Sequence, residues 1–292
     1  MQKIKGRSKS SKSVVLTGDM HVGHVFALAS PLKKLKVVND FWKSAPDKLK
    51  NGNPDVFIIN GEPIDGDGYK DIGSQQHITD MGDQLEVAND YLEYFKMGCI
   101  GMTRGSNYHT TRGNTNFEKL FSKLITCAPI LDYSPYGRWV SREAHKTKSL
   151  EPTASRNYNK SIDDILQFRI HDTVFNVIHH TSSSGSYTYV PTTIANPMLK
   201  NLILTGKLWD AKDAPTITVR SHTHTHVFVK YGRTCGFVTP AWQIFSRFML
   251  QKGMSAATIG LVEVIIEPNN EYSVRDILLP DKDYPKIRLL EL

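Results

Sequence analysis

Three apolar runs near the start of the chain each end in a polar turn that contains glycine. Val14 to Leu16, Asp55 to Ile59 and Cys99 to Thr103 have the composition of buried strands. The segments that follow them have helical periodicity in whole or in part: 28–49, 80–96 and 116–126. Strand–helix units in series favour a parallel sheet covered by helices. Ligands of such sheets bind beyond the carboxyl ends of the strands, so we expect the chemistry of the chain in those turns.

From residue 165 onward the pattern becomes β-like. Ile165 to Ile170 and Val174 to Ile178 flank His171-Asp172-Thr173, a candidate hairpin turn. Residues 191–208 are compatible with a helix. Further strands are expected near 216–220, 226–230, 235–239, 258–266 and 272–279. With no repeat or linker to divide the chain, we expect one domain, residues 14–292, built from two sheets.

Two segments are expected to stand apart from this domain. The first, residues 1–13, is basic and is predicted to be a disordered tail, with a nucleic-acid-binding arm as the alternative. The second, near 134–162, is polar and without apolar periodicity, and we interpret it as a surface insert.

Composition excludes several classes of protein. Of the 292 residues 40% are hydrophobic and 22% charged, which suits a globular domain with a sizeable core. No apolar run is long enough to cross a membrane, and the basic N-terminus lacks the apolar segment of a signal peptide. The three cysteines are widely spaced, so we expect no disulfide framework, no cysteine metal site and a reducing, cytoplasmic setting. The net charge of +7 suits polyanionic partners such as DNA or RNA.

Side chains that bind metals follow five of the apolar strands. In chain order these turns are Gly18-Asp19-Met20-His21, Gly61-Glu62-Pro63-Ile64-Asp65, Gly105-Ser106-Asn107-Tyr108-His109, His179-His180 and Ser221-His222-Thr223-His224. Each residue alone has an ordinary structural explanation, but five such turns on one edge of a sheet are hard to assign to chance. Oxygen and nitrogen ligands without thiolate fit Mn²⁺, Fe, Zn²⁺ or Ni²⁺. About seven candidate ligands exceed the need of one ion and suit two ions that activate a water and hold a phosphoryl group.

The order of these motifs resembles the calcineurin-like metallophosphoesterase family. The resemblance covers Val14 to about Val229, and the residues of the motifs are most similar to those of phage and prophage members. It implies an α/β fold of four layers (αββα), in which two mixed sheets are flanked by helices. It also implies two divalent ions, and Mn²⁺ is the metal we expect. A phage-encoded chain would act in the cytoplasm of its host.

By this resemblance each motif has a role. Asp19, His21 and His224 would hold the first ion, and Asn107, His179 and His222 the second. Glu62 would bridge the two ions at the position where the family usually has Asp, and Asp65 would orient a neighbouring histidine. His109 would assist the leaving group while a metal-bridging hydroxide attacks phosphorus.

Several positions have alternatives. In the third motif, either Asn107 is the ligand and His109 the acid, or Ser106 aligns with the family Asn and His109 is itself a ligand. In the fourth motif the ligand is His179 or His180, and the end of the apolar run favours His179. We expect His24, His77 and His226 beside the site rather than in it. The arginines near the motifs bind a substrate phosphate or form surface salt bridges: Arg104, Arg112 and Arg220.

The sequence therefore predicts a metal-dependent hydrolase of phosphate esters. Basic charge and phage-like motifs favour a phosphodiesterase or nuclease acting on DNA or RNA. The alternatives are a phosphomonoesterase, including a protein phosphatase, and a metal-binding module that has lost catalysis. No membrane partner is expected.

Overall fold

The computed structural model describes residues 10–67, 75–106, 109, 111–112, 115–128, 165–180, 194–199, 215–247, 249 and 257–286. Its strands are β1 (Lys12–Thr17), β2 (Val56–Asn60), β3 (Cys99–Thr103), β4 (Thr111–Arg112), β5 (Thr115–Asn116), β6 (Leu166–Ile170), β7 (Thr173–Val177), β8 (Ile217–Arg220), β9 (Val227–Tyr231), β10 (Thr234–Val238), β11 (Gly260–Ile266) and β12 (Tyr272–Leu278). Its helices are η1 (Lys33–Leu35), α1 (Lys36–Lys48), α2 (Met81–Leu92), α4 (Phe117–Leu124) and η4 (Asp281–Asp283).

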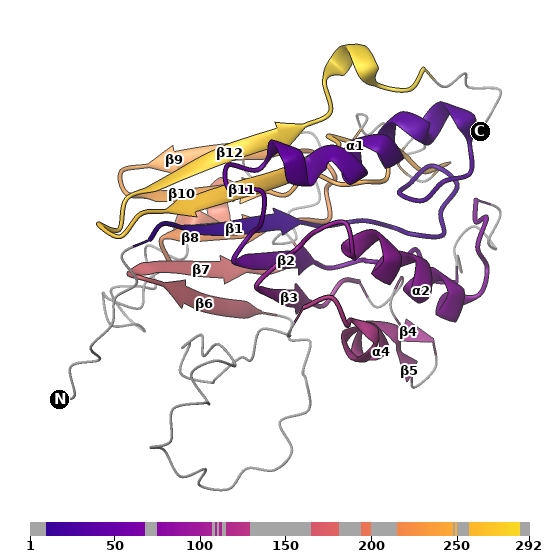
Figure 1. Cartoon of the computed structure of the whole chain (residues 1–292), viewed down its shortest axis with the longest axis horizontal. Coiled ribbons are helices and arrows are strands. Elements are labelled where there is room, and N and C mark those ends of the chain that lie inside the picture. The colour runs from indigo at the N-terminus through magenta and orange to yellow at the C-terminus, as the bar shows by residue number, and fades with distance from the viewer. Residues whose placement is uncertain are drawn as a thin grey trace, which may run out of the picture.

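The first sheet has the strand order β12-β11-β1-β2-β3 (Figure 1). Strands β1, β2 and β3 are parallel, with Val14 opposite Val56 and Val56 opposite Cys99. These are the three apolar runs in which the sequence indicated a parallel layer. Strands β11 and β12 come from the end of the chain and add an antiparallel edge beside β1.

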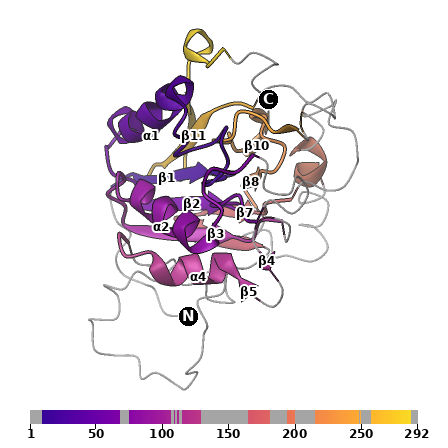
Figure 2. The same cartoon turned by 90° about the vertical axis from the view of Figure 1, so that its right-hand side faces the viewer.

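Helices α1, α2 and α4 cover the outer face of the first sheet (Figure 2). Trp42 of α1 is fully buried there, and its ring lies 5.2 Å from that of Phe95 and 4.7 Å from that of Trp242. Helix α2 begins after Asp80, whose side chain caps it by accepting hydrogen bonds from the backbone N–H groups of residues 82 and 83. Asn116 caps α4 in the same way.

The second sheet has the order β6-β7-β8-β10-β9, with β7, β8 and β10 parallel and a hairpin at each edge. Its inner face meets the first sheet in a shared core that includes Val14, Ile58, Phe175, Val219 and Phe237. On its outer face, the helical residues 194–199 pack through Ile194 and Met198 against Val238. Helices, sheet, sheet and helix follow one another, so the expected four-layer α/β sandwich is confirmed.

The first expected strand is longer than its apolar run. Strand β1 begins at Lys12, because Lys12 and Ser13 pair with β11 and Lys12 Nζ lies 2.7 Å from Asp55 Oδ1; the last two residues of the expected tail are thus part of the sheet. Helix α1 continues through Pro46, which lies in its last turn. The expected helix at 191–208 is described over 194–199 only.

Residues 1–9 of the expected tail and the expected insert 134–162 lie outside the described residues. Among the described residues, no helix has the length and apolar character needed to cross a membrane.

Candidate metal centre

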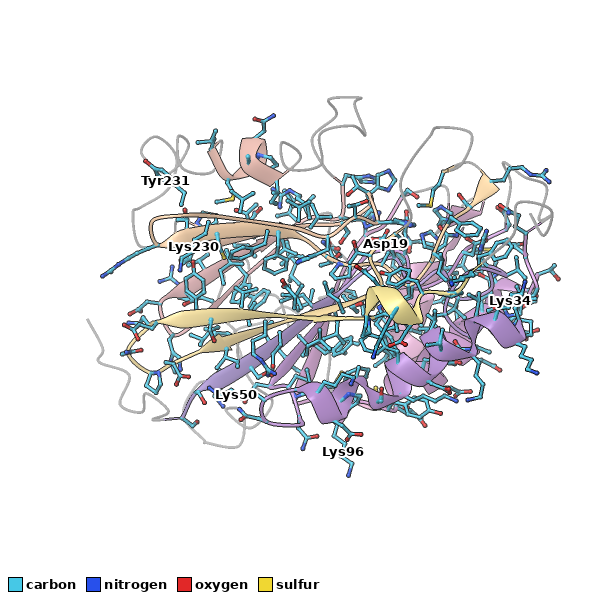
Figure 3. The ribbon with its side chains drawn as sticks, turned by 90° about the horizontal axis from the view of Figure 1, so that it is seen from above. Asp19, Lys34, Lys50, Lys96, Lys230 and Tyr231 are labelled. Carbon is cyan, nitrogen blue, oxygen red and sulfur yellow. The ribbon has the colours of Figure 1, made fainter. Side chains whose placement is uncertain are left out.

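The carboxyl ends of strands from both sheets meet at one end of the sandwich. Asp19 follows β1 and Glu62 follows β2 in the first sheet, whereas His179 follows β7 and His222 follows β8 in the second. Figure 3 shows Asp19 well away from Lys230 and Tyr231, which mark the opposite end of the second sheet. Four of the five predicted turns are therefore brought together by the packing of the two sheets.

The backbone of these turns is unusual. Eight described residues other than glycine have a left-handed φ, and five of them are predicted ligands: Asp19, His21, Glu62, His222 and His224. This conformation costs an L-residue about 1–2 kcal/mol. It is retained because neighbouring chain segments fix the turns; for example, the Asp19 N–H donates to Gly61 O at 3.2 Å and the His21 N–H donates to Glu62 O at 3.1 Å. Such clustering is typical of functional sites.

Four predicted ligands form a first cluster. Asp19, His21, Glu62 and His224 are buried, and one ligand atom from each lies within 4.8 Å of the others. His21 Nε2 lies 3.0 Å from Glu62 Oε2, and His224 Nε2 lies 3.4 Å from Asp19 Oδ1. Two carboxylates and two imidazoles around one point match the donor set of a divalent transition metal.

Hydrogen bonds orient this cluster from behind. The His21 Nδ1–H donates to Asp65 Oδ1 at 3.2 Å, and Asp19 Oδ2 accepts the backbone N–H of His222 at 3.1 Å. Their other atoms, His21 Nε2 and Asp19 Oδ1, are buried without a hydrogen-bond partner among the described residues. Buried polar atoms are rarely left unpaired, so these residues fit a cation between them.

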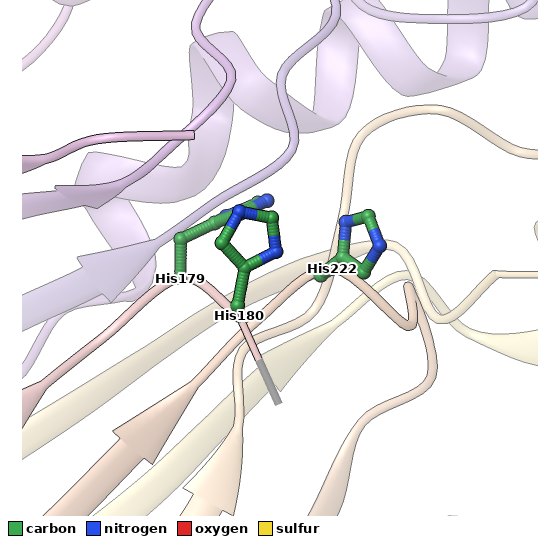
Figure 4. Close-up of side chains that lie close together, drawn as sticks. All are labelled: His179, His180 and His222. Carbon is green, nitrogen blue, oxygen red and sulfur yellow. The ribbon is translucent and has the colours of Figure 1, made fainter. Parts of the chain in front are cut away.

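A second cluster consists of His179, His180 and His222 (Figure 4). The His179 Nδ1–H donates to Asn60 O at 2.7 Å, which leaves His179 Nε2 as the ligand atom, 3.2 Å from Glu62 Oε1. Glu62 thus faces the first cluster with one oxygen and the second with the other. This is the placement that a bridging carboxylate needs.

The third motif is described only in part. Ser106 contacts Glu62 Oε1 through both its N–H, at 3.0 Å, and its hydroxyl. The His109 Nδ1–H donates to Asp65 O at 2.6 Å, and the His109 ring lies 4.6 Å from that of His21. Asn107 and Tyr108 lie outside the described residues, so whether Asn107 or Ser106 is the family ligand stays a prediction.

Charge in the cluster follows from burial and from carboxylate–imidazole pairs. Burial alone would lower the pKa of His21, but the neighbouring carboxylates of Asp65 and Glu62 outweigh it and raise that pKa to about 10. The carboxylates of Glu62 and Asp19 likewise raise the pKa of His179 to about 9 against the effect of burial. For His222 burial dominates and lowers the pKa to about 4. Burial opposes ionisation of Asp19, but His224 and His179 outweigh it and lower the pKa of Asp19. The centre therefore retains anionic carboxylates that attract positive charge, whether protons or metal ions.

The remaining predicted residues lie around this centre. His24 accepts the Phe26 N–H at 3.0 Å and the His226 Nδ1–H donates to Val238 O at 2.7 Å, so both rings are tied to backbone. The Arg220 guanidinium donates to Asn176 Oδ1 at 3.0 Å and to two backbone carbonyls, which is a structural set of contacts. Arg104 is half-buried directly after β3, and the Arg112 side chain is outside the described residues. A phosphate contact by any of these arginines stays a prediction.

Glu118 is a residue of the site that the motifs did not predict. Glu118 of α4 is fully buried, and its Oε1 accepts the Gly105 N–H at 2.8 Å directly behind Glu62. Burial raises the pKa of Glu118 to about 7. The sequence does indicate that Glu118 is buried, because it lies on the same face of the predicted helix as Phe121 and Ile125.

No protein family and no curated protein matches the sequence. Among solved structures, a Vps29 variant from Entamoeba histolytica matches at 10% identity and a TM-score of 0.41, over 92% of this chain and 99% of that one. An archaeal phosphodiesterase matches at 12% identity and a TM-score of 0.42, over 91% of this chain and 99% of that one. A predicted phosphoesterase from Streptococcus pneumoniae TIGR4 matches at 8% identity and a TM-score of 0.34, over 92% of this chain and 99% of that one. With TM-scores below 0.5, these similarities assign neither a family nor an activity to the chain.

Proposed function

We propose that the chain is a metal-dependent phosphoesterase with two divalent ions, and that its substrates are phosphodiesters, DNA or RNA among them. One observation carries the proposal: the two oxygens of Glu62 lie beside two clusters of candidate ligand side chains, and these side chains come from both sheets. The resemblance of the motifs to calcineurin-like metallophosphoesterases supports the same function.

The residues divide into ligands and groups that orient them. Asp19, His21 and His224 would hold the first ion and His179 and His222 the second, with Glu62 between the two. Asn107 is proposed as a further ligand of the second ion. Two ions placed so would lower the pKa of a bound water and neutralise the phosphoryl oxygens during in-line attack.

The chain itself supplies orientation and proton transfer. Asp65 fixes the His21 ring through its side chain and the His109 ring through its backbone carbonyl. Because Nδ1 donates to that carbonyl, Nε2 is the His109 nitrogen that would donate a proton to the leaving oxygen. Burial holds the pKa of His109 below its usual value, so at neutral pH its Nε2 would first have to take up the proton released by the attacking water and would then pass it to the leaving oxygen.

The substrate class is proposed from charge. A net charge of +7 favours polyanions, and binding to DNA or RNA would then weaken steeply with salt. The basic residues of the 1–9 segment are a candidate contact for such a substrate. Their removal is expected to weaken nucleic-acid binding and to leave hydrolysis of a small diester intact.

The test is hydrolysis of bis-p-nitrophenyl phosphate and p-nitrophenyl phosphate by metal-stripped protein, with and without added Mn²⁺. Diester hydrolysis that requires Mn²⁺ is expected, with slower monoester hydrolysis. A preference for the monoester would replace the phosphodiesterase by a phosphomonoesterase. Bound Mn²⁺ with no hydrolysis of either compound would indicate a metal-binding module, and no binding of Zn²⁺, Ni²⁺, Fe²⁺ or Mn²⁺ would overturn the proposal.

A further inference from the structure

The second ligand cluster contains one imidazole more than the motifs account for. His179, His180 and His222 have ring centroids 5.0, 5.2 and 5.1 Å apart, so the three rings stand at nearly equal separations. One nitrogen of each ring lies within 4.8 Å of the others. Figure 4 shows the three imidazoles gathered above two neighbouring loops, those that follow β7 and β8.

Two of the three rings already have a nitrogen that needs a partner. His179 Nε2 and His222 Nδ1 are buried without a hydrogen-bond partner among the described residues. His179 is fully buried, and its Nδ1–H is committed to Asn60 O, so its Nε2 is available as an electron-pair donor. The pair therefore points to a ligand, and His180 stands beside both rings.

We propose that His180 is a further ligand of the second ion, so that this ion is held by three imidazoles and Glu62. The inference rests on the proposed metal centre and deepens it. His179 and His180 are thus not alternatives: one ring enters from the buried side and the other from the exposed side of the same site.

The two sites then differ in donor chemistry. The first has two imidazoles and two carboxylates, whereas the second has three imidazoles and shares one carboxylate. Imidazole-rich sites favour Zn²⁺, Ni²⁺ and Co²⁺ over Mn²⁺, which prefers oxygen ligands. We therefore expect the second site to be the more selective against Mn²⁺.

The experiment is a Co²⁺ titration of metal-stripped full-length chain, followed by visible absorption and by proton NMR of the hyperfine-shifted imidazole resonances. The variant is His180→Phe, which keeps a planar ring and removes the donor nitrogens. The matched control is His171→Phe, a histidine in the β6–β7 turn. His180→Asn is a second variant in case the larger ring perturbs folding.

The unsubstituted chain is expected to bind two equivalents of Co²⁺. In both His180 variants one equivalent should bind at least about ten-fold more weakly, and the resonances of one histidine should disappear. The His171 variant should match the unsubstituted chain.

Two results would overturn the inference, and they are distinguishable. If the unsubstituted chain binds two equivalents and the His180 variants keep both affinities and all resonances, His180 is not a ligand, and the proposed function stands. If the unsubstituted chain binds no Co²⁺, the metal centre itself fails and the role of His180 fails with it.

Discussion

Glu62 lies between the two candidate ligand clusters and contacts a histidine of each. Its two oxygens lie 3.0 Å from His21 Nε2 and 3.2 Å from His179 Nε2, and Ser106 fixes the second of these oxygens. Burial opposes its ionisation, but His109, His179 and His21 outweigh burial and hold the pKa of Glu62 well below its usual value. The longer side chain, where the resembling family usually has Asp, reaches both clusters from a left-handed turn.

Glu62→Gln keeps the shape of this side chain and removes its charge. Because both clusters share the carboxylate, we expect both metal equivalents to bind at least about ten-fold more weakly, with diester hydrolysis falling in parallel. Calorimetric titration with Co²⁺ measures this. Glu267→Gln, at an exposed glutamate paired with Lys50, is the control; an unchanged titration of the Glu62 variant would contradict the bridging role.

Glu118 supports the turn behind Glu62 by accepting the Gly105 N–H. Glu118→Gln retains the acceptor for the Gly105 N–H, so we expect stability at pH 7 to be unchanged or raised. Glu118→Ala leaves that N–H unpaired in a buried place and should cost about 1–3 kcal/mol of unfolding free energy. Urea denaturation distinguishes the two; equal losses would show that the hydrogen bond is not the reason for a buried glutamate.

At the scale of the elements, the turn after β2 depends on close approach. Gly61 has φ +77°, and a Cβ there would lie 2.3 Å from His179 Nδ1. Gly52 has φ +70° with no atom within 4 Å of such a Cβ. The two glycines therefore share a backbone conformation and differ in surroundings.

Gly61→Ala should displace the His179 ring, lower stability by more than the backbone cost alone and weaken the second metal equivalent. Gly52→Ala should cost only about 1–2 kcal/mol for the backbone and leave metal binding intact. Thermal unfolding and Co²⁺ titration of both variants provide the comparison. Equal behaviour of the two would mean that the contact with His179 does not matter.

The sequence predicted those features of the fold that depend on local patterns along the chain. The apolar runs of β1 to β3 and the helical periodicity of 80–96 are local patterns, and they predicted a parallel layer and the position of α2. The order β12-β11-β1 depends on pairing between chain ends, which no local pattern encodes. Likewise, the turn motifs predicted Asp19, Glu62, His179 and His222, but only the packed sheets place Ser106 and Glu118 around Glu62.

At the scale of the whole molecule, the candidate ligands come from both sheets. Asp19 and Glu62 extend from the first sheet, and His179 and His222 from the second. An ion bound to ligands of both sheets binds the native chain and not the unfolded one, so it must stabilise the native state.

Mn²⁺ at about one hundred times its dissociation constant should add about 2.7 kcal/mol to the unfolding free energy. At one fixed Mn²⁺ concentration the effect should be larger at pH 8 than at pH 6, because His21 and His179, with pKa values of about 10 and 9, must release protons to bind metal and the dissociation constant therefore falls as the pH rises. Without metal the same raised pKa values stabilise the chain below about pH 6.5, and this is lost as the pH rises through 9 to 10. Calorimetric scans with Mn²⁺ and with chelator, at both pH values, check the sign; a stabilisation independent of pH would contradict it.

The left-handed ligand turns have a consequence for how fast and how selectively an ion is taken up. Folding has already set the backbone of Asp19, His21, Glu62, His222 and His224, so binding requires little reorganisation of the main chain. If an ion binds there, turns fixed in this way would limit how far the site can expand for a larger ion. Selection by ionic radius, with Ca²⁺ excluded, would then follow from the same five dihedral angles that make the turns costly to fold.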